Sequence, residues 1–197
     1  LMTVIGVAGC TALMLTGFGL RYAISSISTL QYGEIFTYGG SLSLSDNLTA
    51  EEAAAAEEEI LGVEGISGAE GLFMRTVDAE AGGNTVSEVN LYVPADPGNL
   101  DPFIKLRDSG SGETLTLSDG GCIITEKLSR LLNIGVGDTI RLGSEGGDMA
   151  EVTVTGVAEG YVLHYVYLTA ADYEALFGEE AVPTSVLYTI AEGADEG

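Results

Sequence analysis

The first 20 residues of the chain contain no charged side chain, and this run constrains the fold more than any other feature. The run reads LMTVIGVAGCTALMLTGFGL, and Arg21 follows it. At a rise of about 1.5 Å per residue, a helix of this length spans about 30 Å, which is the thickness of the hydrocarbon core of a bilayer. The sequence therefore predicts a transmembrane helix with its stalk over residues 1–28, with residues 1–20 in the membrane, followed by a polar and acidic domain over residues 29–197.

Two other interpretations of the run compete with a membrane helix. A buried core helix could be equally apolar, but core helices are usually shorter than this uncharged run. A cleaved signal peptide needs a basic segment before a short apolar region, and no basic residue precedes the run. The membrane helix is therefore the preferred interpretation.

Small residues inside the run indicate how the helix packs. In lipid, helices associate by close packing between small residues. The run offers five of them at Gly6, Ala8, Cys10, Ala12 and Gly17. This composition favours a helix that belongs to a bundle, with a single-pass anchor as the alternative.

The charge of the chain excludes several classes of partner. Seven Lys and Arg residues stand against thirty Asp and Glu, which gives a net charge of −23. Nucleic-acid binding needs clustered cations, so we predict no nucleic-acid partner. Docking onto an anionic lipid surface is disfavoured for the same reason. Cys10 lies in the apolar run and Cys122 does not, so no disulfide is predicted, and Cys122 is expected to be a small buried residue.

Alternation and helix caps predict an α+β domain. In TVSEVNLYVP, the residues Val89, Leu91 and Val93 alternate with polar neighbours, as in a half-buried strand. Thr49 and Glu52 fit a capping box at a helix start. Several strands with few helices indicate helices that cover one face of a sheet. Strands are expected near residues 33–45, 68–80, 85–96, 102–108, 122–124, 139–142, 150–159, 159–169 and 182–192, and helices near 49–62, 125–132 and 169–178.

The same periodicity predicts which residues face the core. The expected inward residues are Ile35, Leu42, Leu44, Ala53, Ala56, Ile60, Leu61, Leu72, Met74, Thr76, Leu128, Leu131, Leu132, Val152 and Val154.

The residues suggest no catalytic, metal-binding or cofactor-binding site. The glycines of GVGD open a strand rather than a helix, and DSGSGET lacks the spacing of a calcium loop. His164 is the single histidine, and no catalytic partner for it is indicated. It lies among Tyr161, Tyr165 and Tyr167, so we predict a sheet edge or an interface there and no enzymatic activity.

Several segments together resemble the FtsX-like (MacB-type) permease family of ABC transporters. They are LMTVIGVAGCTALMLTGFGLRYAI, QYGEI, GCIITEKLSRLLNIGVGDTIRL and VTVTGVAEGYVLHYVYLTAADYEALFG. The resemblance covers the helix and residues 119–178, whereas residues 50–107 match only in the order of elements. It implies a two-lobed mixed α/β ectodomain, with a β-α-β core lobe at about 33–107 plus 184–197 and an inserted β-rich lobe at about 108–183.

The resemblance also implies a function. Such a chain would be a non-catalytic extracytoplasmic domain at the cell membrane, without a cofactor, that handles substrates or extracytoplasmic partner proteins. Its first helix would couple it to a separate cytoplasmic ATPase through a stalk that includes Arg21, Ile24 and Ile27, and further membrane helices would follow Gly197. The alternative is a single-pass, membrane-anchored extracellular domain for ligand binding or adhesion.

Overall fold

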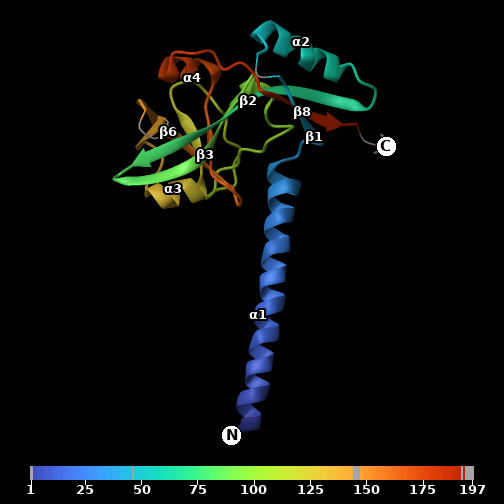
Figure 1. Cartoon of the computed structure of the whole chain (residues 1–197), viewed down its shortest axis with the longest axis vertical. Coiled ribbons are helices and arrows are strands. Elements are labelled where there is room, and N and C mark those ends of the chain that lie inside the picture. The colour runs from blue at the N-terminus through green and yellow to red at the C-terminus, as the bar shows by residue number, and fades with distance from the viewer. Residues whose placement is uncertain (1, 46, 144–146, 192, 194–197) are drawn as a thin grey trace.

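A long helix projects from the domain in the computed structural model, which describes residues 2–45, 47–143, 147–191 and 193. Helix α1 (Met2–Leu30) continues into a π-helical turn, η1 (Gln31–Ile35). Figure 1 shows α1 pointing away from all other elements. Residues 6–25 are exposed along their whole length, which excludes the core-helix interpretation. The segment Gly6–Ile35 is long and apolar enough to cross a membrane.

The described residues after η1 form one mixed sheet of eight strands with three α-helices. The elements after η1 are β1 (Gly40–Ser43), α2 (Ala50–Leu61), β2 (Ile66–Ala81), β3 (Asn84–Pro94), the 3-10 turn η2 (Pro97–Asn99), β4 (Cys122–Thr125), α3 (Glu126–Leu132), β5 (Thr139–Gly143), β6 (Met149–Ala158), β7 (Tyr165–Tyr167), α4 (Ala170–Phe177) and β8 (Ser185–Ile190). The strand order is β1-β8-β2-β3-β7-β4-β6-β5. Strand β5 also pairs with β2, so the six strands from β2 to β5 in this order close into a ring. The predicted α+β class is confirmed.

Strand β2 belongs to both parts of this sheet. Its first residues, from Ile66 to Leu72, pair with β8, and its later residues, from Asp78 to Glu80, pair with β5. Where the second stretch begins, between Val77 and Ala79, the pairing with β3 shifts register, and Glu88 takes a φ of 59°. An extra residue in one strand bends the ladder and increases its twist. The bulge is therefore where β2 and β3 curve into the ring.

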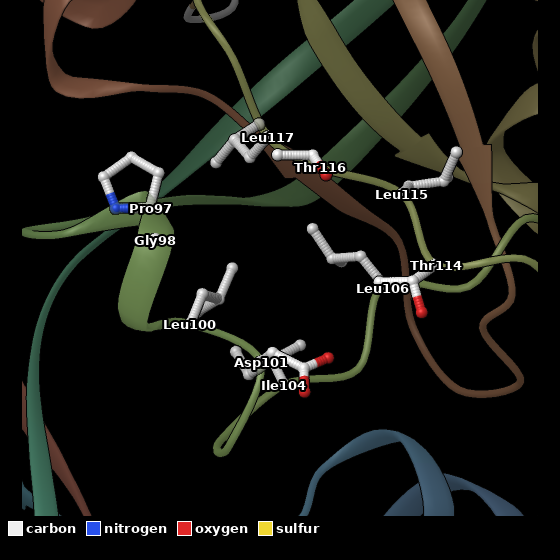
Figure 2. A pocket seen from close by; sticks show the side chains of 10 residues that line it. All are labelled: Pro97, Gly98, Leu100, Asp101, Ile104, Leu106, Thr114, Leu115, Thr116 and Leu117. Carbon is white, nitrogen blue, oxygen red and sulfur yellow. The ribbon is translucent and has the colours of Figure 1, made fainter.

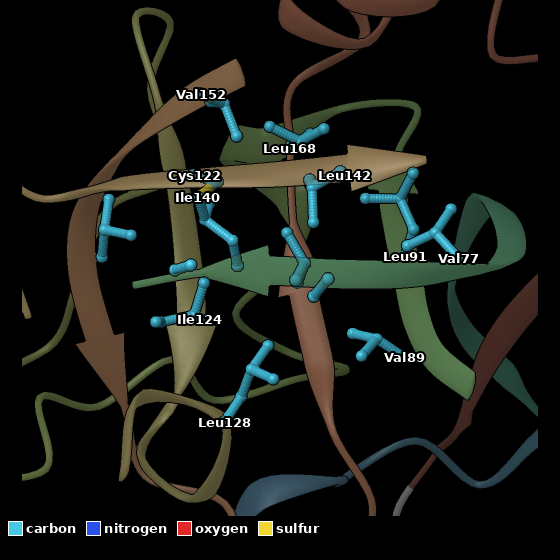
Figure 3. Packing of buried hydrophobic residues seen from close by; sticks show 14 of the residues in the cluster. Val77, Val89, Leu91, Cys122, Ile124, Leu128, Ile140, Leu142, Val152 and Leu168 are labelled. Atoms are coloured by element: carbon cyan, nitrogen blue, oxygen red, sulfur yellow. The ribbon is translucent and has the colours of Figure 1, made fainter. Parts of the chain in front are cut away.

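Two hydrophobic clusters lie on opposite faces of the shared strands. In β4 and β7, Ile124 and Val166 belong to the first cluster, whereas the adjacent Ile123 and Tyr167 belong to the second. This division follows from the alternation of side chains along a strand. Figure 3 shows the first cluster, which Leu128 of α3 joins. The second cluster contains Ile35, Phe36, Leu72, Leu100, Phe103, Ile104, Leu106, Leu117, Ile123, Ala158, Tyr165, Tyr167 and Leu187.

Many local predictions are confirmed. Thr49 and Glu52 form the expected capping box, with the Thr49 N–H donating to Glu52 Oε2 at 2.9 Å. Val89, Leu91 and Val93 are buried, as their alternation predicts.

Six predictions of core residues or strands are wrong. The exposed residues among those expected to face inward are Leu42, Leu61, Met74, Thr76 and Leu131. The strand expected at 102–108 is absent, and this segment contains only isolated bridges, such as Phe36 with Ile104. Instead, Phe103, Ile104 and Leu106 of this segment bury their side chains in the second hydrophobic cluster without forming a strand. The predicted lobe boundaries near residues 108 and 183 stay a prediction.

Candidate functional site

The end of α1 is fastened to the domain by backbone hydrogen bonds. The π-helical turn closes with the Phe36 N–H donating to the Gln31 carbonyl oxygen at 2.8 Å. The Ile35 carbonyl then accepts from the Lys105 N–H at 2.8 Å, and the Thr37 N–H donates to the Phe103 carbonyl at 2.9 Å. We call this region the stalk junction: residues 31–38 together with segments 102–107 and 159–165.

Gln31 joins the junction to the loop before β7. Its side chain is 1% exposed, and its Oε1 accepts hydrogen bonds from the N–H groups of Tyr161 at 2.9 Å and Val162 at 3.1 Å. Buried backbone donors need such partners, because an unpaired one costs about 1–3 kcal/mol. The last turn of the helix therefore supplies an acceptor that the loop lacks in its own backbone.

Arg107 forms the charged part of the junction. Its Nη2 lies 3.2 Å from a Glu34 carboxylate oxygen and 3.0 Å from a Glu159 carboxylate oxygen. The guanidinium thus bridges η1 and the loop that follows β6. The Tyr161 hydroxyl donates to Glu159, and this hydrogen bond, together with burial, raises the pKa of Tyr161 to about 12. Because the Arg107 side chain is 30% exposed, water screens these pairs and each contributes modestly to stability.

Aromatic rings fill the space between the stalk and the sheet. The Phe36 ring meets Tyr165 edge-on at 5.4 Å between centroids, and Tyr165 lies 5.1 Å from Tyr92. Tyr165 also stacks with Tyr167 at 6.2 Å. Burial raises the pKa of Tyr92 to about 12, so this hydroxyl stays neutral at any ordinary pH. Each such pair adds about 0.5–1.5 kcal/mol beyond the burial of its area.

The aromatic residues singled out from the sequence divide into two groups. Tyr161 and His164 are half-buried in the loop before β7, whereas Tyr165 and Tyr167 are buried within β7. Since β7 pairs with β3 on one side and β4 on the other, the predicted sheet-edge position is wrong. An interface role for all four residues stays a prediction.

One ring nitrogen of His164 lacks a hydrogen-bond partner among the described residues. Its Nδ1 is buried without a hydrogen-bond partner there. Burial, and then the charge of Lys127, lower the pKa of His164. The imidazole is therefore neutral near pH 7.

The predicted stalk residues lie outside the junction. Arg21, Ile24 and Ile27 are exposed on α1 before it reaches the domain. Sequence reasoning missed Gln31, Glu34, Phe36 and Arg107, which make the junction. The one local signal is that Gln31 and Glu34 are polar residues at the end of an apolar helix.

Three kinds of site would indicate chemistry or a small ligand among the described residues: a metal site, a small-molecule cavity and a reactive cysteine. No group of three or more His, Cys, Asp or Glu side chains among them could hold a metal ion. A cavity of about 120 Å³ opens between segments 97–106 and 114–117 (Figure 2). Sites for small molecules usually measure about 300–1,000 Å³, so this cavity is too small for most of them. Burial raises the pKa of the Cys122 thiol to about 12, which makes it a poor nucleophile.

Comparisons with known proteins indicate where this fold occurs. The family described as MacB-like periplasmic core domain matches residues 1–196. The chain is similar to the periplasmic region of MacB from Actinobacillus actinomycetemcomitans, with 13% identity and a TM-score of 0.50, over 73% of this chain and 66% of that one. It therefore spans slightly less than two thirds of the MacB region.

A second solved structure shares the fold. The extracellular domain of the noncanonic ABC-type transporter YknZ from Gram-positive bacteria has 18% identity and a TM-score of 0.53, over 78% of this chain and 83% of that one. The comparison with curated proteins finds no match.

Proposed function

Since this chain belongs to the family of MacB-like periplasmic core domains, and is thus an extracytoplasmic domain of a MacB-like ABC transporter permease, we propose that α1 couples it to a separate cytoplasmic ATPase. Residues 1–20 lie in the cell membrane and the main domain lies outside it. The domain performs no catalysis of its own. It handles substrates or partner proteins on the outer side of the membrane.

The stalk junction is the observation that carries this proposal. A helix transmits movement to a domain only if its end is fixed there. Gln31, Phe36 and the Glu34–Arg107–Glu159 bridge attach the end of α1 to segments 102–107 and 159–165. A tilt of α1 would therefore move these segments with it, and β7 behind them.

The exposed face of α1 supports contacts with other membrane helices. Arg21 directly follows the apolar run, at the depth where a long basic side chain reaches the membrane interface. Ile24 and Ile27 are 60% and 39% exposed beyond it. We assign these three residues to the stalk that passes movement from the membrane to the junction.

We also infer a two-lobed domain, with the inserted lobe near residues 108–183. The pairing of β8 with β1 and β2 supports this division, because it returns the end of the chain to strands of the first lobe. Strands β2 and β3 contribute to both clusters, so the lobes share a sheet.

The coupling proposal is tested on the intact permease with its ATPase in proteoliposomes. An environment-sensitive fluorophore is placed at exposed loop position 163 by Leu163→Cys in a Cys10→Ser background. We expect an ATP-dependent signal with the native stalk and its loss in Ile24→Pro, which interrupts the helix. ATP hydrolysis should continue, and Ile24→Ala, which keeps the helix, should retain the signal. An unchanged ATP-dependent signal in Ile24→Pro would contradict the proposal.

A further inference from the structure

We propose that the groove between α2 and α4 binds a basic, amphipathic segment of an extracytoplasmic partner protein. This inference rests on the proposed function, because it names the surface and the chemistry by which the domain would recognise such a partner. The groove has a volume of about 420 Å³. It is lined by Ala50, Ala54, Glu57, Ala95, Ala170, Ala171, Glu174, Glu180, Ala181 and Pro183.

Each helix presents one stripe to the groove. On α2, Ala50, Ala54 and Glu57 follow the spacing i, i+4, i+7, which places them on the same face. On α4, Ala171 and Glu174 are three residues apart and also share a face. Methyl groups therefore line the walls, with carboxylates beside them.

Gly71 of β2 lies against three of the residues that line the groove. A Cβ on Gly71 of β2 would lie 2.9 Å from Glu57 Oε2, 3.1 Å from Pro183 Cγ and 3.3 Å from the Ala95 Cβ. Glycine lets these groups come together, and the Gly71 N–H donates to Glu57 at 3.0 Å. The hollow itself follows from the alanines on both walls.

The charge of the groove is complementary to a cationic segment. Its lining contains three carboxylates, from Glu57, Glu174 and Glu180, and neither Lys nor Arg. Arg75, which follows Gly71 on β2, forms an ion pair with Glu179 at 2.6 Å. Complementary charge steers association and selects partners of opposite sign.

The lining favours a protein segment over a small molecule or a lipid surface. Small-molecule sites are lined mainly by large apolar and aromatic side chains, whereas this groove has alanines, one proline and carboxylates. Figure 1 shows α2 and α4 on the side of the domain opposite the free end of α1, away from the membrane that α1 would enter. An amphipathic helix that lays its face into a groove is a recurrent mode of peptide recognition.

The test is peptide binding to the full chain in detergent micelles. The probe is a fluorescein-labelled amphipathic peptide with alanines on one helical face and lysines beside them, followed by fluorescence anisotropy at about 0.15 M salt. A peptide of the same composition in scrambled order is the control for charge alone. We expect Glu174→Gln with Glu180→Gln to weaken binding about tenfold, because two of the three groove carboxylates are lost.

Matched variants separate the groove from the overall negative charge. Glu58→Gln with Glu59→Gln removes the same charge from exposed positions of α2 outside the groove and should change affinity less than about twofold. Ala54→Trp fills the groove without changing charge and should abolish binding, whereas Ala55→Trp, outside the lining, should not.

Three results would overturn the proposal. They are equal weakening by both pairs of Glu→Gln changes, unchanged binding in Ala54→Trp, or equally tight binding of the scrambled peptide. Peptide binding in this experiment does not require any movement of α1. Its failure therefore leaves the ATP-driven test of the stalk unaffected, and the two proposals fail separately.

Discussion

Gln31 Oε1 lies 2.9 Å from the backbone nitrogen of Tyr161, and this hydrogen bond joins residues 130 positions apart in the sequence. It connects the last turn of the N-terminal helix to the loop that leads into β7. Here a side-chain amide oxygen accepts hydrogen bonds from backbone N–H groups, which backbone carbonyl groups accept elsewhere in the fold. The contact is therefore a sensitive point at which to weaken the stalk junction.

Gln31→Ala should loosen the loop before β7. The N–H groups of Tyr161 and Val162 lose their acceptor, and since both residues are half-buried, water replaces it incompletely. We expect a loss of about 1–2 kcal/mol in the free energy of unfolding and faster hydrogen exchange at these two amides. Ser25→Ala, at an exposed position of α1, is the control. Native protection of both amides in Gln31→Ala would refute the role of this contact.

Glu70 should make the domain less stable as the pH rises. Glu70 is 1% exposed as a residue. Burial, with smaller effects of Glu57 and Asp96, raises the pKa of its carboxyl group to about 7, despite hydrogen bonds from the Asp96 N–H at 2.7 Å and the Asn99 amide at 2.8 Å. In the unfolded chain the group ionises near pH 4.5. Between about pH 4.5 and 7 the folded state therefore keeps a proton that the unfolded state releases, and stability falls as the pH rises.

Glu70→Gln removes this dependence and keeps an oxygen that can accept from Asp96. The variant should gain about 1–2 kcal/mol of stability relative to the native chain as the pH rises from 4.5 to 7.5. Denaturant unfolding at both pH values measures the difference. Glu58→Gln, at an exposed position, should show no such gain. Parallel pH curves for Glu70→Gln and the native chain would contradict the prediction.

Local features of this fold were predictable because their causes are local. The capping box of Thr49 and Glu52 involves residues three positions apart, and the alternation in β3 follows directly from its sequence. The buried face of α3 was only partly predictable, because the helix has seven residues and several apolar positions. Leu128 and Leu132 turn inward, while Leu131 lies on the flank of this stripe and is exposed.

The stalk junction was not predictable, because its contacts join distant segments. Gln31 and Arg107 look like ordinary surface residues in the sequence. Their partners are Tyr161, Glu34 and Glu159, and only the closure of the sheet brings these segments together. The closure in turn depends on the bulge at Glu88, and alternation alone does not reveal it.

The two faces of α3 should respond differently to truncation. Leu128 is fully buried in the first cluster, so Leu128→Ala removes apolar contacts and leaves a cavity that costs about 2–5 kcal/mol. Leu131 is 50% exposed, so Leu131→Ala should cost less than about 1 kcal/mol. Thermal or denaturant unfolding of the two variants gives the comparison. Equal losses would mean that α3 is rotated relative to this structure.

Cys122 should react with thiol reagents only after the domain unfolds. Its side chain is fully buried between β6 and β7, and burial, with a smaller effect from Asp172, raises the pKa of its thiol to about 12. The raised pKa keeps the thiol from forming the reactive thiolate, and burial keeps the reagent from reaching the sulfur. In a Cys10→Ser background, N-ethylmaleimide should leave the native chain unlabelled and label it in guanidinium chloride, as mass spectrometry would show. Rapid labelling of the native chain would indicate that the first hydrophobic cluster opens to solvent, because the Cys122 side chain is buried in it.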